Sequence, residues 1–319
     1  MIRHLAVFLG AAALGLATLL PYRSLDLEDL KELKRLAERR PATTVLLGNS
    51  VSRTFSRCDE DTASIGDMMA AAGAPVIELA RGGLKLDKMM KYGRLAALVR
   101  EVDTVVLPIQ VYDGFLQLAE GDARPSIGRL IYQERSHFEA AAPTGDESYR
   151  GVRYGNLGEI SATYFPVESA AMTCPENAGR NSDFVTYMYW RNYLRLAEPL
   201  AGLDALVAYR RELDARSTEL LAVFMPQNLA LMEKLHGPEA VARLRGQVAQ
   251  AMQALRAGGV RVLDLTVAVA QEGFIDQWCA CGHLGEGGRR KVAGTVARFL
   301  EDRSPVSTAA ANERPGAGT

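Results

Sequence analysis

A serine, a side-chain amide and a histidine stand at three places where short apolar runs of the sequence end. Ser50 follows the first such run, Gln110 follows the third, and His283 lies just before the last helical segment. Gly82 and Gly83 follow the second run. A serine hydroxyl can attack an acyl carbon, a histidine can take its proton, and amide N–H groups can stabilise the oxyanion that forms. These residue types predict an acyl-transfer site.

The segments that must position these residues alternate between two kinds. Short apolar runs rich in β-branched residues predict strands, and longer stretches with helical spacing of apolar residues predict helices. Strands alternating with helices at this spacing predict an α/β fold, a parallel five-stranded sheet with helices on both faces. Residues that follow the strands then meet at the carboxyl edge of the sheet. The predicted strands are 44–47, 75–80, 103–109, 220–224 and 260–264, and the predicted helices are 59–73, 85–101, 228–257 and 286–302.

The order of these residues resembles that of the SGNH (GDSL-type) hydrolases. The resemblance rests on Gly48-Asn49-Ser50 after the first strand, a glycine after the second, an amide after the third and a C-terminal His-Leu-x-x-x-Gly that begins at His283. It covers roughly 43–302 and implies a flavodoxin-like three-layer sandwich. It also implies that Ser50 is the nucleophile, that His283 is the base, and that Gly82 or Gly83 together with Gln110 donates to the oxyanion.

Three positions depart from the pattern of that family. Asn49 stands where aspartate is usual, and Gln110 stands where asparagine is usual. The acid of the family lies three residues before the histidine, where this chain has Ala280, and the nearest carboxylate is Asp276. The third member of the triad is therefore either Asp276 or absent, which leaves a Ser–His dyad. Two alternatives concern the serine itself: Ser52 is a rival nucleophile, and a serine after a strand is often only a helix cap.

The resemblance also implies a function. With a membrane anchor, the chain looks most similar to the subgroup that modifies cell-envelope or exported polysaccharides beside a membrane-bound acyltransferase. The expectation is a serine esterase or O-acyltransferase that acts on acyl esters of such a glycan. Because Ala280 replaces the usual acid, the alternative is a catalytically degenerate scaffold or glycan-binding partner in an envelope assembly.

The N-terminus predicts the compartment. Residues 5–20 form an uncharged apolar run behind Arg3 and His4, and acidic residues follow it. Such a run is slightly short for a membrane helix and long for the core of a cleaved signal peptide. We expect residues 1–22 to be a signal anchor in the inner membrane, with cleavage after Ala17 as the alternative. The positive-inside rule then exports the rest of the chain to the periplasm.

The remaining chain divides into a linker, a core domain and a tail. Residues 23–42 predict a linker helix with alternating leucines and charges, and 43–303 the SGNH-like domain. Within it, 113–182 lacks periodicity and reads as an insertion, while 304–319 reads as a disordered tail. Of the 22 aromatic residues, 13 lie in 112–193. Because tyrosine suits sugar rings, Tyr112, directly after a strand, is expected to contact substrate together with Asn49.

Composition excludes several classes of protein. Lysine and arginine number 37 and aspartate and glutamate 38, a formal net charge of −1, which argues against a nucleic-acid-binding protein. No glycine-rich phosphate loop follows the first strand, so no nucleotide cofactor is expected. No metal is expected either, because Cys279, Cys281 and His283 lack a fourth ligand. The adjacent Arg289 and Arg290 are interpreted as a solvated helix face.

Four cysteines in an exported chain are candidates for two disulfides. Cys279 and Cys281 are too close in sequence to pair comfortably with each other. We therefore expect one of them to pair with Cys58 and the other with Cys174, which would tie the serine and histidine loops together. The alternative is four reduced, buried thiols.

Overall fold

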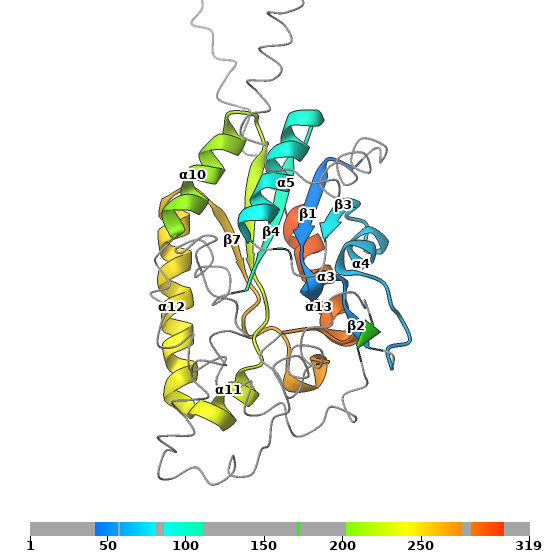
Figure 1. Ribbon diagram of the computed structural model, residues 1–319, viewed down its shortest axis with the longest axis vertical. Helices are drawn as coiled ribbons and strands as arrows, with labels where there is room; N and C mark the ends of the chain where they lie inside the picture. Colours follow the sequence, from blue (N-terminus) through cyan, green and yellow to red (C-terminus); the bar gives the residue numbers. More distant parts are fainter. Residues whose placement is uncertain are drawn as a thin grey trace, which may run out of the picture.

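The computed structural model describes residues 42–56, 58–80, 84, 86–110, 171–172, 202–275 and 282–302 (Figure 1). Its centre is a five-stranded sheet in which every neighbouring pair of strands is parallel. The predicted parallel five-stranded sheet is therefore confirmed. The strands, in their order across the sheet, are β3 (Val76–Ala80), β1 (Thr44–Gly48), β4 (Thr104–Ile109), β6 (Glu219–Phe224) and β7 (Arg261–Asp264).

This strand order fixes where a ligand can enter. Numbered along the chain, the five strands run 2-1-3-4-5, the flavodoxin-like order that was expected. The direction of winding reverses between β1 and β4, which pair with Leu46 opposite Val106. In open α/β sheets the binding crevice lies beyond the carboxyl ends of the strands at this reversal. Ser50 and Gln110 each follow one of these two strands.

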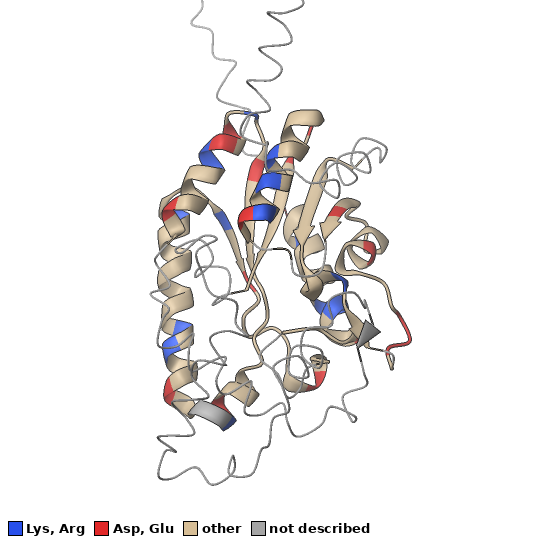
Figure 2. Ribbon diagram, viewed as in Figure 1, with Lys and Arg blue, Asp and Glu red and all other residues tan. Residues whose placement is uncertain are grey.

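Helices cover both faces of the sheet, as predicted (Figure 1). Successive strand residues point to opposite faces, so Val45 and Leu47 join one buried cluster and Leu46 the other. The first cluster packs against α5 (Leu86–Val99), α10 (Leu203–Asp214) and α12 (Pro238–Ala257). The second packs against α4 (Ile65–Ala71) and α13 (Glu286–Glu301). Acidic and basic residues are interspersed along α5, α10 and α12 (Figure 2).

Two predicted helices differ from the structure. The helix expected over 59–73 begins at Ile65, because Ser64 and Asp67 form a capping box that fixes its first turn. The helix expected over 228–257 is two helices, α11 (Leu229–His236) and α12. Gly237, with φ of +80°, separates them, and the proline that follows it occupies the first turn of α12.

Several elements were not expected from the sequence. They are the helix α10, a four-residue helix α3 (Ser50–Arg53) and a short 3₁₀ helix η5 (Gln271–Gly273). A second, two-stranded sheet pairs β2 (Phe55–Ser56) in parallel with β5 (Ala171–Met172). This small sheet joins the chain just after Ser50 to the predicted insertion.

Most of the predicted peripheral segments lie outside the described residues. These are the signal anchor over 1–22, the linker 23–42 except its last residue, the insertion 113–182 except β5, and the tail 304–319. Within the described ranges no helix combines the length and the apolar composition that a membrane crossing needs. The predicted anchor, and the periplasmic location that depends on it, stay predictions.

Candidate active site

Ser50 is held at the start of α3 without serving as its cap. The N-cap is Asn49, whose side-chain oxygen accepts from the Val51 backbone N–H at 3.0 Å. The Ser50 carbonyl accepts from the Thr54 N–H at 2.8 Å and closes the turn. The Ser50 hydroxyl is thus left for other partners, and the capping role weighed for this serine belongs to Asn49.

Ser52, the rival nucleophile, faces the interior. Its side chain is buried, and its hydroxyl donates to the Asn49 carbonyl at 2.9 Å. Gly48 makes room for it, since a Cβ on this glycine would lie 2.0 Å from the Ser52 oxygen. Of the two serines, only Ser50 meets a histidine.

His283 approaches Ser50 from the loop that precedes α13. The His283 Nε2 and the Ser50 Oγ lie 3.0 Å apart, although the two residues are 233 positions apart in sequence. The imidazole is largely buried. A bridge between Phe274 and Leu284 holds this loop at its base, and the Ile275 N–H donates to the His283 carbonyl at 2.9 Å. The chain is therefore held at His283 and directly after it.

Gln110 reaches the same loop. A Cβ on Gly282 would lie 3.4 Å from the Gln110 Nε2, so the amide group lies against the residue before His283. Gly282 has φ of +74°, which a glycine adopts without strain. An amide donor thus lies near the Ser50–His283 pair, as an oxyanion site would require.

Several predicted site residues lie outside the described residues: Gly82, Gly83, Tyr112, Asp276, Cys174, Cys279 and Cys281. Ala80 and Ile275, which lie just before the two glycines and before Asp276, are described. Arg53, which the sequence did not single out, donates to the carbonyl of Ala80 at 2.9 Å, at the end of the strand that leads to the two glycines. Asp276 directly follows Ile275, whose backbone bonds to His283.

Arg289 corrects one prediction. It was interpreted with Arg290 as a solvated helix face, yet its side chain is 0% exposed, whereas that of Arg290 is 62% exposed. The reason is that Arg289 turns inward and donates to four backbone carbonyls and the Asp59 carboxylate. Gly288 and Val292, buried on the same side of α13, were the available signal.

Cys58 is disulfide-bonded. The other three cysteines lie outside the described residues, so the structure leaves the predicted pairing untested. The backbone N–H of Cys58 donates to the Ser56 hydroxyl at 3.1 Å, and Asp59 follows it directly. The disulfide therefore holds the chain between the Ser50 helix and Asp59, the residue whose carboxylate binds Arg289.

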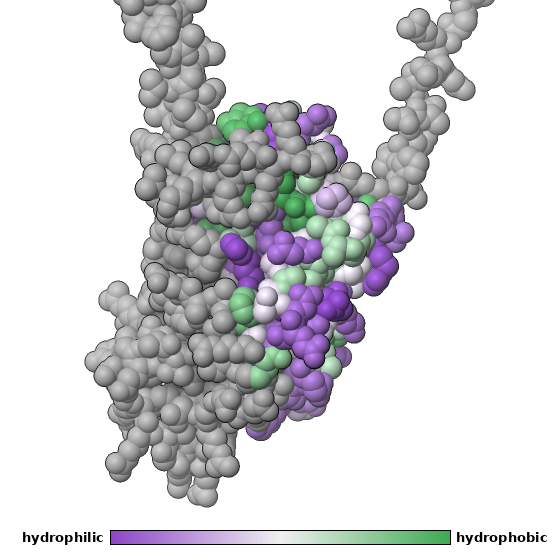
Figure 3. All heavy atoms as spheres, turned by 90° about the vertical axis from the view of Figure 1, so that its right-hand side faces the viewer, coloured by the Kyte–Doolittle hydropathy of each residue, from purple (hydrophilic) through white to green (hydrophobic). Residues whose placement is uncertain are grey.

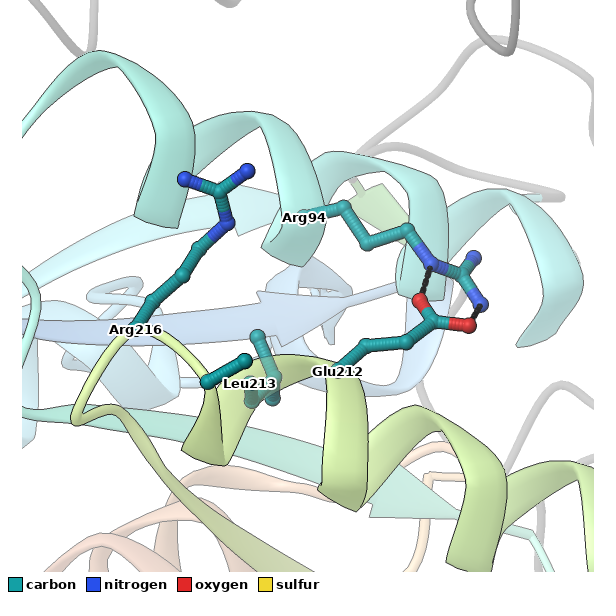
Figure 4. Close-up of a pocket in the computed structure, with 5 residues that line it drawn as sticks. Arg94, Glu212, Leu213 and Arg216 are labelled. Carbon is teal, nitrogen blue, oxygen red and sulfur yellow. Dashed lines mark hydrogen bonds and ion pairs between the residues drawn. The ribbon is translucent and has the colours of Figure 1, made fainter.

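A cavity of about 420 Å³ lies elsewhere, between α5 and α10 (Figure 4). It is lined by Arg94, Glu212, Leu213, Ala215 and Arg216. The chain enters β6 from the turn that carries Arg216, so this cavity is near the amino edge of the sheet, opposite to Ser50. Among the described residues, no group of three or more histidine, cysteine, aspartate or glutamate side chains could hold a metal ion.

No protein-family model matches the chain, and no curated protein matches its sequence. Solved structures similar to it include a protein of Bacteroides fragilis assigned as an acylhydrolase (TM-score 0.43, 9% identity, covering 87% of this chain and 98% of that one). A second is a GDSL-like lipase of Bacteroides thetaiotaomicron, with a TM-score of 0.39 and 9% identity, covering 84% of this chain and 94% of that one. A third is a catalytic mutant of an acetylxylan esterase of Geobacillus stearothermophilus, with a TM-score of 0.40 and 7% identity, covering 82% of this chain and 96% of that one. The strand-end residues resemble the same GDSL-type group. At these TM-scores and identities, a functional assignment has to come from this chain's own geometry.

Proposed function

We propose that this protein is a serine esterase. The observation that carries the proposal is the 3.0 Å distance between the Ser50 Oγ and the His283 Nε2 at the carboxyl edge of a flavodoxin-like sheet. A nucleophile and a base within hydrogen-bond reach are the minimal parts of covalent acyl transfer. The rival serine is committed to a backbone carbonyl, so Ser50 alone occupies this position.

The reaction follows from these two side chains. The neutral imidazole of His283 takes the Ser50 proton while the hydroxyl oxygen bonds to the ester carbonyl carbon. The tetrahedral intermediate collapses, the bond to the leaving alcohol breaks, and the imidazolium returns its proton to that alcohol. Water then attacks the acyl-serine and gives a proton to His283. The second tetrahedral intermediate collapses, the bond between Ser50 Oγ and the acyl carbon breaks, and the imidazolium returns its proton to Ser50 Oγ, which releases the carboxylic acid and free Ser50. Each half-reaction begins and ends with neutral imidazole.

Three groups are proposed to support this chemistry. The Gln110 amide, which lies against the residue before His283, would donate to the oxyanion together with the backbone of Gly82 or Gly83. Asp276 is the proposed orienting acid. Its sequence neighbour Ile275 bonds to the His283 backbone, which brings the chain at this point beside the histidine.

The finer proposal concerns the substrate. We propose an acyl ester of a cell-envelope or exported glycan, because aromatic residues concentrate in 112–193 and an apolar N-terminal run predicts export. Tyr112 and the side-chain NH₂ group of Asn49 would contact the sugar. A sugar hydroxyl in place of water would convert hydrolysis into O-acyl transfer, with a membrane-bound acyltransferase as the partner.

The test is labelling and turnover at Ser50. We expect the folded protein to react with a fluorophosphonate probe at Ser50 and to hydrolyse a chromogenic acetyl ester. Ser50→Ala should abolish both, whereas the matched variant Ser52→Ala should retain both. Acetylated oligosaccharides, with and without a sugar acceptor, then distinguish hydrolysis from transfer. A folded protein that is neither labelled nor active would overturn the proposal in favour of a non-catalytic scaffold.

A further inference from the structure

Arg289 occupies the junction between the two segments that carry the reacting side chains. Its guanidinium is fully buried and bonds to the segment 58–64. On the face of the molecule turned to the viewer in Figure 3, hydrophilic residues gather beside apolar ones. The Nε donates to the Ala63 carbonyl at 3.1 Å, and one terminal nitrogen, Nη2, donates to the Asp61 carbonyl at 2.5 Å. Both acceptors belong to the chain that follows the Ser50 helix.

The other terminal nitrogen contacts both sides of the site at once. Arg289 Nη1 donates to the carbonyl of Thr54 at 3.3 Å and to that of Leu284 at 3.0 Å. Thr54 closes the turn that begins at Ser50, since its N–H bonds to the Ser50 carbonyl. Leu284 is the residue after His283. A single nitrogen atom therefore links the end of the serine turn to the histidine loop.

Asp59 neutralises the buried guanidinium and extends the link. One carboxylate oxygen accepts from Arg289 Nη1 at 2.8 Å and from the Ser56 N–H at 2.8 Å. The other accepts from the Glu286 N–H at 3.3 Å, in the first turn of α13. The Asp59 side chain is 11% exposed, so the ion pair is largely shielded from water. We name Arg289 and Asp59, with these bonds, the clamp.

We propose that the clamp is a positioning device, in which Arg289 and Asp59 set the distance between His283 and Ser50. This inference rests on the proposed function. Buried ion pairs contribute little net stability compared with apolar residues of the same volume. Their strength is geometric, because a planar guanidinium with five donors fixes the direction of every partner. Here those partners are the backbone on either side of the reacting pair.

The expected consequence is a loss of turnover rather than of binding. A displacement of about 1 Å in a reacting group can lower the rate about 100-fold. Lysine at position 289 keeps the charge but has three donors in place of five. We expect Arg289→Lys and Asp59→Asn each to lower kcat by about 10- to 100-fold, while KM stays within about threefold.

Two control variants separate this effect from general destabilisation. Arg290→Lys changes the adjacent, exposed arginine and should leave kcat within about twofold. Val296→Ala opens a cavity further along α13, on the buried face; it should lower Tm yet leave kcat within about twofold. All variants are compared at a temperature at which circular dichroism shows each to be folded. If Arg289→Lys does not fold, Asp59→Asn alone tests the clamp.

A second measurement does not depend on turnover. The imidazole ¹⁵N shifts of His283, assigned among the four histidines with His283→Gln, report the hydrogen bond between Nε2 and Ser50. We expect Arg289→Lys and Asp59→Asn to move the Nε2 signal and Arg290→Lys to leave it unchanged. Unchanged shifts and unchanged kcat in the folded clamp variants would overturn the inference. If the wild-type protein cleaves no ester but these shifts still move, the clamp stands and the proposed function fails.

Discussion

Two arginine–carboxylate pairs lie near opposite edges of the central sheet. At the carboxyl edge Arg289 and Asp59 have side chains that are 0% and 11% exposed. Near the amino edge Arg94 pairs with Glu212, with side chains that are 26% and 51% exposed, in the wall of the cavity in Figure 4. The first arginine donates to backbone on two sides of a reacting pair, whereas the second lies over the Tyr209 ring, 4.9 Å from its centre.

The difference shows that a cavity and a reactive site need not coincide. The amino edge has a hollow whose arginine is paired with a neighbouring helix, and none of the described residues that line it is a serine, cysteine or histidine. The carboxyl edge has the serine, the histidine and the buried charge that joins their loops. We expect substitutions at the carboxyl edge to lower turnover and, at the buried ion pair, stability as well. Substitutions near the amino edge should change only solubility or, slightly, stability.

The largest expected effect is at the orienting acid. If Asp276 holds the His283 imidazole, Asp276→Asn should lower kcat by about 10⁴-fold, because the amide favours the wrong tautomer. The matched change near the amino edge, Glu212→Gln, should leave kcat unchanged. Steady-state hydrolysis of a chromogenic ester measures both. An unaltered rate in Asp276→Asn would mean a Ser–His dyad or another acid.

The next effect is on stability. Asp59→Asn should reduce the free energy of unfolding by about 3–5 kcal/mol, since it leaves a buried guanidinium unpaired. Either orientation of the new amide also turns its NH₂ toward a donor, Glu286 N–H on one side or Arg289 and Ser56 N–H on the other. Glu212→Gln should cost about 0–1 kcal/mol, as exposed pairs do. Urea denaturation measures the free energy of unfolding of both variants. If Asp59→Asn and Glu212→Gln lost the same amount, the buried and the exposed ion pair would not differ in their contribution to stability.

The sheet and the reacting pair were predictable from the sequence because their signals are local. The central strands are short apolar runs that are buried along almost their whole length, and Ser50, Gln110 and His283 each lie beside such a run or before a helix. Parallel strands bring their carboxyl ends to one edge whatever the connecting loops do. The position of these residues along the chain was therefore sufficient to predict that they lie at the same edge of the sheet.

The clamp could not be predicted, because its contacts are not local in the sequence. The bonds of Arg289 to Thr54, Asp59 and Ala63 cross more than 225 positions of sequence, and most of the acceptors are carbonyls that every residue has. Periodicity likewise missed the non-helical segment before Ile65 and the break at Gly237. There, a capping box and a positive φ override an otherwise helical composition.

The disulfide offers a smaller effect at the same edge. In the two-stranded sheet Phe55 lies opposite Ala171 and Ser56 opposite Met172. Cys58 is two positions after Ser56 in sequence, and Cys174 is two positions after Met172. Among the pairings open to Cys58, we therefore favour Cys174 over Cys279 or Cys281. Peptide mapping without reductant identifies the partner.

Loss of this bond should lower the free energy of unfolding by about 2–4 kcal/mol. Cys174→Ser should reproduce the effect of reduction, whereas Cys281→Ser should not if Cys58 pairs with Cys174. A Cys58–Cys279 or Cys58–Cys281 peptide would instead restore the link between the serine and histidine loops that the sequence suggested.

The smallest expected effect concerns the exposed carboxylate beside the clamp. The Asp61 backbone N–H donates to Glu286 at 3.0 Å and Arg290 donates at 2.7 Å, and both lower the pKa of the Glu286 carboxyl below its ordinary value of 4.5. A pKa that is lower in the folded state means that the stabilisation is present above the unfolded-state value and is lost as the pH falls through the folded-state value.

Wild type should therefore be more stable than Glu286→Gln at neutral pH, and the gap should close on acidification below about 4.5. Thermal unfolding of both proteins across this range measures the gap. Thermal unfolding of Glu212→Gln over the same pH range provides the comparison with a carboxylate near the amino edge. A gap at position 286 that widened in acid would reverse the sign of the interaction and contradict the expected stabilisation by the Glu286 carboxylate.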